Sequence, residues 1–219
     1  MKIDFHVHTK FSPDSIISPD DLARKSKKLK IIPAITDHNS MGAVKHLRKL
    51  KIPFIPGQEV HTDRGDLIGL YTNEAIPKGT PFAETADKIH GQGGITYLPH
   101  MYDITRAGAV PAEGEEGKMD IIEVFNARCM SDMFNLRARL FAKKHKKPVA
   151  AGSDTHFLWE FGTTYTGLPD FDLENPKELL KALEKGEIVG KKAPFYVRGT
   201  TSMLKAGRKL SKALLLSRE

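Results

Sequence analysis

Short apolar runs rich in Ile, Val and Phe alternate with stretches typical of helices, and this alternation constrains the fold more than any other feature of the chain. The predicted strands span residues 2–8, 31–36, 53–60, 66–71, 94–99, 121–125 and 148–152. The predicted helices span residues 42–50, 82–90, 132–145 and 176–184, and another begins at the capping residue Ser18. This pattern predicts an α/β protein with a mainly parallel sheet, either open or closed into a barrel.

The chain of 219 residues is long enough for one domain with a sizeable core and short for two. We therefore expect a single domain over residues 1–219, with a basic tail from about residue 200. Only a few residues separate the strands on either side of Arg64 and Gly65, which predicts one hairpin within the parallel pattern. A last short strand is expected at residues 195–197, and the loop of residues 103–118 is expected to be the most mobile segment. The tail is amphipathic and should pack on the barrel, and its apolar positions are Leu204, Leu210 and Leu214 to Leu216.

Composition indicates a globular protein of a reducing compartment. Hydrophobic residues make up 40% and charged residues 28% of the chain, and no apolar run is long enough to cross a membrane. The N-terminus lacks the pattern of a signal peptide, so we expect a cytoplasmic location and no membrane partner. Cys129 is the only cysteine, so an intrachain disulfide is excluded. We interpret Cys129 as a packed or surface thiol. The net charge of +7 is compatible with phosphorylated or nucleic-acid partners, although its lysine runs fit solvated helix faces.

The first predicted strand ends in Asp4-Phe5-His6-Val7-His8. Side chains two residues apart on a strand point to the same face, so His6 and His8 project together while Phe5 and Val7 pack behind them. Two imidazoles in this arrangement suit a metal ion. One such pair is still compatible with chance.

Other predicted strands end in residues of the same kind. These residues are Asp37 and His38, Glu59, His100, Asn126, and Asp154 with His156. The carboxyl ends of parallel strands meet at one edge of an α/β fold, so residues far apart in sequence should lie close together there. Five of the nine histidines occupy such positions, which scatter would rarely produce. The sequence therefore predicts a metal site, and the alternative is a set of polar residues without an ion at a loop-rich barrel mouth.

The remaining histidines have weaker claims to a function. His46, His90 and His145 fall on predicted helices, where solvent-facing imidazoles are ordinary. His61 shares a strand face with Glu59, so it either supports a ligand or belongs to a loop.

Ordered motifs along the chain resemble those of the PHP family, which is named for polymerase and histidinol phosphatase. The motifs are HVHTKFSPDS, TDHN, GQEV, LPH, EVFN and GSDTH, and together they cover about residues 1–162. The resemblance implies a distorted (β/α)7 barrel similar to a TIM barrel, with its active site at the carboxyl ends of the strands. It also implies a cleft with up to three metal ions and hydrolysis of phosphate esters.

The resemblance implies three ligand sets when it is carried over onto this sequence. They are His6, His8 and Asp154; His100 and Asn126, with Glu59 bridging to the first set; and Asp14, His38 and His156. The ions would be two or three of Zn, Mn or Fe, with Mg also compatible. Asn126 departs from the family, because many relatives have a histidine there and an amide oxygen is a weaker ligand. Asp66 falls where some relatives have a histidine, and it is either a site residue or a turn aspartate that opens a strand.

Such a cleft would carry a charge of about +3 and attract phosphate. The expected reaction is attack on phosphorus by a hydroxide held between two ions, while a third ion neutralises the phosphate oxygens. The residues expected to take part in catalysis are His6, His8, Glu59, Asp154 and His156. Candidates for binding phosphate or a base are Lys10, Arg106, Arg128 and Arg137. The general acid is left open among His156, Asp37 and bound water.

Three other functions are compatible with the sequence. A metal-dependent amide or lactam hydrolase would also begin with two histidines on its first strand, but it leaves Asp14 and the pair of Asp154 and His156 unexplained. An exonuclease or repair nuclease on single-stranded nucleic acid fits the basic charge. A barrel that binds RNA without catalysis is disfavoured. Such a protein would be expected to have lost its metal ligands, whereas this sequence retains them. The sequence does not choose between a phosphorylated small molecule and a nucleic-acid end, and it leaves the oligomeric state open.

Overall fold

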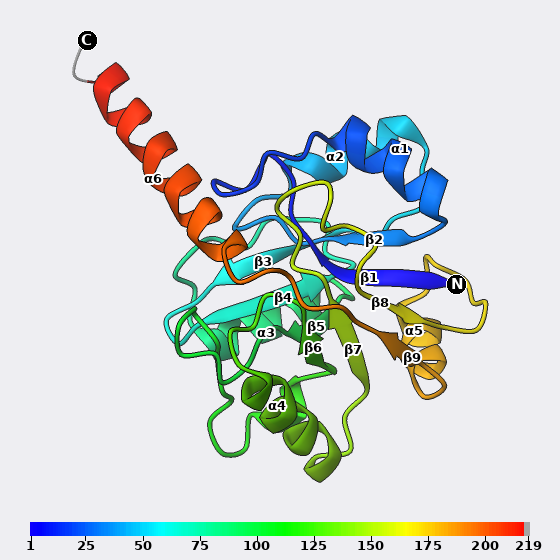
Figure 1. Ribbon diagram of the computed structural model, residues 1–219. Coiled ribbons are helices and arrows are strands. Elements are labelled where there is room, and N and C mark those ends of the chain that lie inside the picture. Colours follow the sequence, from blue (N-terminus) through cyan, green and yellow to red (C-terminus); the bar gives the residue numbers. More distant parts are fainter. Residues whose placement is uncertain (217–219) are drawn as a thin grey trace.

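The computed structural model describes the backbone of residues 1–216 and the side chains of residues 1–211, and in it strands and helices alternate as expected (Figure 1). The part of the chain up to residue 152 contains β1 (Lys2–Val7), α1 (Pro19–Leu29), β2 (Ile32–Ile35), α2 (Gly42–Leu50), β3 (Gly57–His61), β4 (Asp66–Leu70), α3 (Phe82–Gly91), β5 (Ile95–Leu98), η1 (Glu116–Lys118), β6 (Ile121–Asn126), α4 (Asp132–Lys144) and β7 (Val149–Gly152). The rest contains β8 (Tyr165–Gly167), α5 (Pro176–Leu183), β9 (Glu187–Val189) and α6 (Val197–Leu216).

Local signals explain where the helices begin and end. At the start of α1, the Ser18 hydroxyl accepts a hydrogen bond from the Asp21 N–H at 3.1 Å, and Pro19 occupies the first turn. The strand predicted at residues 195–197 is wrong, because α6 begins at Val197. The β-branched and aromatic residues there resemble a strand in sequence, but Val197 is buried and anchors a helix.

The strands form a four-stranded sheet of order β2-β1-β8-β9 and a five-stranded sheet of order β3-β4-β5-β6-β7. Three pairings are parallel: β1 with β2, β5 with β6, and β6 with β7. β4 is antiparallel to β3 and β5, which confirms the predicted hairpin. Isolated bridges join the sheets at Ala34 with Ile55, His38 with Glu59, and Val7 with Thr155. The α/β class is therefore confirmed, whereas regular pairing does not run around a closed barrel of parallel strands.

The core lies between the two sheets and under the helices that flank them. Phe5 of β1 stacks on Tyr97 of β5 with ring centroids 5.9 Å apart, which joins the two sheets through aromatic packing. α1 and α2 lie side by side over β2, and α4 covers β6 on the other side of the molecule (Figure 1). These contacts hold β1, β6 and β7 together, so that their carboxyl ends open toward one region.

α6 begins beside this region and then extends away from the rest of the molecule (Figure 1). Val197 and Thr201 are buried, and the Arg208 guanidinium donates to the Ser12 carbonyl at 2.9 Å. Met203 and Leu210 are 76% and 63% exposed, so only the N-terminal part of the tail packs on the body as expected. The side chains of Leu214 to Leu216 lie outside the described residues. Within the described part of the chain, no helix has the length and apolar character needed to cross a membrane.

Candidate metal centre

The two histidines of β1 project to the same side, as their spacing predicts. Their Nε2 atoms lie 3.0 Å apart, and Asp154 Oδ1 is 3.4 Å from the Nε2 of His8 and 3.8 Å from that of His6. One ligand atom from each of these residues lies within 4.8 Å of the others. The structure thus brings together the first ligand set that the family resemblance implies.

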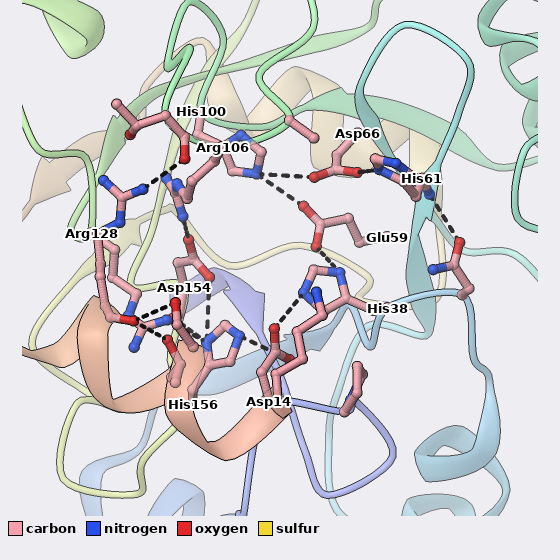
Figure 2. A pocket seen from close by; sticks show the side chains of 18 of the residues that line it. Asp14, His38, Glu59, His61, Asp66, His100, Arg106, Arg128, Asp154 and His156 are labelled. Carbon is pink, nitrogen blue, oxygen red and sulfur yellow. Dashed lines mark hydrogen bonds and ion pairs between the residues drawn. The ribbon is translucent and has the colours of Figure 1, made fainter. Parts of the chain in front are cut away.

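A second group forms next to the first. The Asp14 carboxylate lies between two imidazoles, with 3.4 Å from Oδ2 to His38 Nε2 and 3.4 Å from Oδ1 to His156 Nε2 (Figure 2). Nitrogen atoms of His8, His38 and His156 also lie within 4.8 Å of one another. The members of the third implied set are therefore neighbours in space.

Glu59 connects these groups to His100. Its Oε2 is 2.8 Å from His38 Nδ1, and its Oε1 is 3.0 Å from His100 Nε2 and 3.5 Å from His6 Nε2. Asn126, the other predicted member of the second set, has its amide oxygen engaged by the Arg106 guanidinium at 3.0 Å. The structure therefore places Glu59 and His100 together, but it gives Asn126 a different partner.

The donor set fits divalent metal ions. Imidazole nitrogens and carboxylate oxygens are ligands that zinc, manganese and iron accept, and here they converge from several elements. Asp14 Oδ1 and Glu59 Oε2 are buried and face imidazole nitrogens, but they make no hydrogen bond of good geometry among the described residues. Buried oxygens of this kind need a compensating partner, which a bound cation would supply.

Charges within the cluster shift the pKa values of its members. Burial and the neighbouring imidazoles of His156 and His38 lower the pKa of His8 to about 3. The pKa of His6 lies well above its ordinary value, because the Asp154, Glu123 and Glu59 carboxylates outweigh burial. Against burial, His6 and Arg106 hold the pKa of Asp154 well below its usual range. The Asp154 carboxylate is thus ionised and able to act as a ligand.

Glu123, which the sequence analysis did not single out, orients the first ligand set. Its Oε1 is 3.1 Å from His6 Nδ1 and accepts a hydrogen bond from the Tyr97 hydroxyl at 3.0 Å. Its Oε2 accepts a hydrogen bond from the backbone N–H of His100 at 2.6 Å. A Cβ on Gly152 would collide with His6 and Glu123, so glycine is required where β7 passes them. A carboxylate on the far nitrogen of a ligand histidine fixes its tautomer and ring orientation.

Two of the candidate ligands have backbones that non-glycine residues rarely adopt. Asp154 has φ 54° and His100 has φ 31°. The bond from the His100 N–H to Glu123 holds one of them, and the bond from the Thr155 N–H to the His6 carbonyl at 3.3 Å holds the segment of the other. Such strain is concentrated at functional sites, because the surrounding structure must support it.

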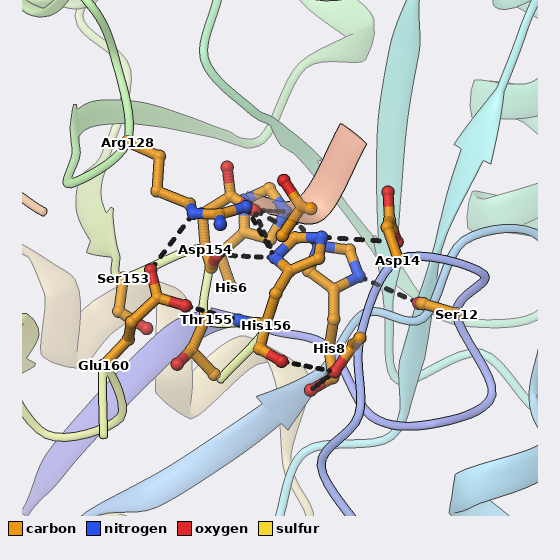
Figure 3. A network of polar contacts seen from close by, with 12 residues as sticks. His6, His8, Ser12, Asp14, Arg128, Ser153, Asp154, Thr155, His156 and Glu160 are labelled. Atoms are coloured by element: carbon orange, nitrogen blue, oxygen red, sulfur yellow. Dashed lines mark hydrogen bonds and ion pairs between the residues drawn. The ribbon is translucent and has the colours of Figure 1, made fainter. Parts of the chain in front are cut away.

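Asp37 lies behind His8 rather than at the site where an acid would be needed. Its carboxylate accepts hydrogen bonds from the Thr9 N–H at 2.6 Å and from the Ser12 hydroxyl at 2.9 Å. Ser12 Oγ is in turn 3.1 Å from His8 Nδ1 (Figure 3). Asp37 is fully buried, and burial raises its pKa. Asp37 therefore lies behind Ser12 and His8 and is not among the residues that line the cavity.

Arg128 links His156 to the start of α6. Its Nε donates to Glu160 Oε1 at 3.1 Å, and its Nη1 is 3.0 Å from His156 Nδ1 (Figure 3). Its Nη2 donates to the Val197 carbonyl at 3.2 Å. The Glu160 carboxylate also accepts a hydrogen bond from the backbone N–H of His156 at 2.9 Å. This network therefore holds His156 through both its ring and its backbone.

Most of the candidate ligands line a cavity of about 390 Å³, whereas His6 and His8 are fully buried and do not line it. Of the cations proposed from sequence, Arg106 and Arg128 line it, whereas Lys10 is exposed and Arg137 lies over the Tyr102 ring at 4.0 Å. The cavity is also lined by cations that sequence reasoning missed, which are Lys78, Arg198 and Lys205. The last two belong to α6, whose place at the cavity required the folded structure.

His61 and Asp66, which were left open, form a pair at the cavity wall. His61 Nδ1 is 2.7 Å from Asp66 Oδ1, and Asp66 Oδ2 is 3.9 Å from His100 Nε2 (Figure 2). Burial and the Glu59 charge raise the pKa of Asp66. Both residues therefore support the site from β3 and β4.

The other histidines and the cysteine lie in ordinary surroundings. His46 pairs with Asp20 at 3.0 Å, and His90 pairs with Asp120 at 2.7 Å. Cys129 is buried, and burial raises its pKa to about 12, so it is a packed thiol.

An α/β fold with histidines and carboxylates converging at its strand ends defines a class of proteins with a candidate multinuclear metal centre, and sequence comparison identifies the family. A model described as PHP domain matches residues 4–85, and one described as PHP-associated matches residues 132–188. An uncharacterized protein of Methanocaldococcus jannaschii is 38% identical over 185 residues, which cover 82% of this chain and 75% of that protein. The chain belongs to the PHP family.

Solved structures show the same fold at low sequence identity. A two-domain protein of Bacteroides vulgatus, described as containing a predicted PHP-like metal-dependent phosphoesterase, matches with a TM-score of 0.69 and 17% identity over 87% of this chain. The chain spans 65% of the length of that protein. An amidohydrolase from Chromobacterium violaceum with bound sulfate and no metal matches with a TM-score of 0.59 and 16% identity, covering 84% of this chain and 97% of that one.

Proposed function

We propose that this chain hydrolyses phosphate esters with the help of divalent metal ions held in the 390 Å³ cavity. The observation that carries the proposal is the convergence of three groups of ligand atoms, each within 4.8 Å, at the ends of several strands. When bound, such ions lower the pKa of water and neutralise phosphate oxygens. The ligands we propose are His6, His8, Asp14, His38, Glu59, His100, Asp154 and His156.

The protein's own residues would position the ligands and the substrate. Glu123 orients His6, Ser12 orients His8, and Arg128 with Glu160 orients His156. The Nε2 atoms of His6 and His8 are thereby held near the Asp154 carboxylate, and little reorganisation is needed when an ion or substrate arrives.

An anionic substrate fits the charge of the cavity. Lys78, Arg198 and Lys205 lie on its wall. Positive groups that line a concave site attract and orient phosphate. A phosphorylated small molecule or a nucleic-acid end would satisfy these groups.

The substrate class is tested with one panel of compounds. Metal-loaded protein is assayed against phosphomonoesters, a single-stranded oligonucleotide and cyclic amides, with and without chelator. We expect chelator-sensitive release of phosphate from a phosphoester. The fold match to an amidohydrolase makes amide hydrolysis the second candidate. Turnover of amides alone would refute the proposal, and nucleotide release from the oligonucleotide would specify a nuclease.

Metal binding is expected to release protons. Against burial, the nearby carboxylates raise the pKa of both His6 and His38 well above the ordinary value, so both carry a proton near neutral pH in the metal-free protein. A ligand imidazole must be neutral, and its proton must leave when the ion binds. The affinity should therefore fall as the pH falls, by about tenfold per pH unit for each proton released.

Calorimetric titration with Mn²⁺ in two buffers of different ionisation enthalpy measures this release. We expect the observed binding heats to differ between the buffers in proportion to that enthalpy. Equal heats in both buffers would show that the imidazoles were already neutral.

Arg198 is expected to bind the substrate. Its Nη2 donates to the Thr105 carbonyl at 3.1 Å, and its Nη1 is buried at the cavity without an acceptor among the described residues. Arg198→Gln should raise the KM for a phosphoester by about tenfold, because a hydrogen bond to a charged group is lost, and change kcat less. Steady-state kinetics on Lys209→Gln, an exposed position of the same helix, provides the control. An unchanged KM in Arg198→Gln would remove Arg198 from the substrate site.

A further inference from the structure

Arg106 reaches into the metal centre from the loop of residues 103–118, in the part of the chain between the two matched segments. Its Nη1 contacts the Asp154 carboxylate (Figure 2). Its Nη2 donates to Asn126 Oδ1 at 3.0 Å. Its Nε donates to Asp103 Oδ2 at 3.3 Å, which fixes the guanidinium from behind. The side chain is only 19% exposed. A fixed positive charge therefore lies beside a proposed metal ligand.

Asn126 has no donor atom left for an ion. Its Oδ1 accepts from Arg106 and, at 2.9 Å, from the Arg128 N–H, so both acceptor positions of the oxygen are used. Its Nδ2 donates to Glu123 Oε2 at 2.9 Å and to Asp154 Oδ2 at 3.2 Å. The reversed amide would point its N–H groups at two donors and its oxygen at two carboxylates, so the contacts fix the orientation.

The remaining donors are too few for an ion at this position. Without Asn126, the second group consists of His6, Glu59 and His100, whose ligand atoms lie within 4.8 Å of one another. His6 Nδ1 faces Glu123, so His6 offers one nitrogen, and that nitrogen also belongs to the first set. An ion in each set would leave only Glu59 Oε1 and His100 Nε2 for the second. Protein metal sites of this kind use at least three protein ligands. A divalent ion there would also lie next to the Arg106 guanidinium, and two cations repel each other strongly in a buried site.

We propose that the Arg106 guanidinium takes the place of the second-site metal ion, with Asn126 holding the guanidinium and not a metal, so that the chain binds two ions. This proposal rests on the metal centre proposed above. The two ions belong to the sets of His6, His8 and Asp154, and of Asp14, His38 and His156, and Glu59 lies between these sets. His100, which is among the ligands proposed above, then pairs with Glu59 and holds no ion. Arg106 then provides a fixed cation where the second set would provide an exchangeable one.

The test is the number of ions per chain. Protein is equilibrated with excess Mn²⁺, freed of unbound metal by gel filtration and measured by elemental analysis. We expect two ions in the wild type and two in Arg139→Ala, an exposed arginine of α4. The double variant Arg106→Ala with Asn126→His removes the cation and adds an imidazole beside Glu59 and His100, so it should bind three. Circular dichroism checks that the double variant is folded.

The outcomes separate this inference from the proposed function. Three ions in the wild type would overturn the role of Arg106 and leave the metal-dependent phosphoesterase standing. A folded double variant that still binds two ions would also overturn it. One ion in the wild type would overturn the two-ion arrangement alone, and a chain that binds no ion would overturn both proposals.

Discussion

Asp154→Ala is expected to lower kcat/KM for phosphoester hydrolysis by on the order of 10³-fold. Asp154 is the carboxylate of the first ligand set, and its Oδ1 lies 3.4 Å from His8 Nε2. Its loss removes a ligand and also leaves the Arg106 guanidinium with Asp103 as its remaining carboxylate partner. The ion of the first set should therefore bind poorly and out of position.

Steady-state kinetics at saturating Mn²⁺ checks this effect. His46→Ala is a suitable control, because His46 pairs with Asp20 on the helical side of the molecule and is partly exposed. The control should retain full activity. If Asp154→Ala hydrolysed the substrate as fast as the control, Asp154 would have no part in the reaction.

Glu59→Gln is expected to cost about 10²- to 10³-fold in the same reaction. Glu59 is fully buried and lies between the two groups of histidines, at 2.8 Å from His38 Nδ1 and 3.5 Å from His6 Nε2. Glutamine keeps the shape of the side chain but removes the negative charge. The protein should therefore stay folded while the ions lose the ligand that connects them.

Elemental analysis and kinetics together distinguish this result from simple unfolding. Glu184→Gln, at an exposed position after α5, provides the same chemical change outside the site. A Glu59→Gln protein with two bound ions and normal kcat would show that Glu59 is not a ligand.

The arrangement of the ligands could be predicted because two local rules act on it. Alternation along β1 places His6 and His8 on one face, and parallel pairing of β6 with β7 brings the strand ends to one edge. These rules need only the sequence of each strand and the order of strands and helices. The hairpin of β3 and β4 could also be predicted from a local feature, which is the short connection at Arg64 and Gly65.

Other features of the site depend on contacts that no local pattern encodes. Arg106 comes from a loop, and its contacts to Asp154 and Asn126 join residues 48 and 20 positions apart. Glu123 was visible in sequence beside Asn126, but only the folded chain shows that it points at His6. The cavity wall formed by Arg198 and Lys205 depends on the direction in which α6 leaves the body.

The predicted barrel is present only in part, because the strands form two sheets instead of one closed sheet. The two sheets meet through isolated bridges, such as Val7 with Thr155, and β8 and β9 extend the first sheet at its other side. β8 and β9 have three residues each, which is too short for a clear pattern of alternation.

The most direct test is the rate of phosphoester hydrolysis as Mn²⁺ is added in small equivalents to metal-free protein. We predict no turnover before addition, a rise in rate with added ion, and a plateau at about two equivalents. Hydrolysis by the metal-free protein, or no phosphoester hydrolysis at full metal loading, would contradict a metal-dependent phosphoesterase.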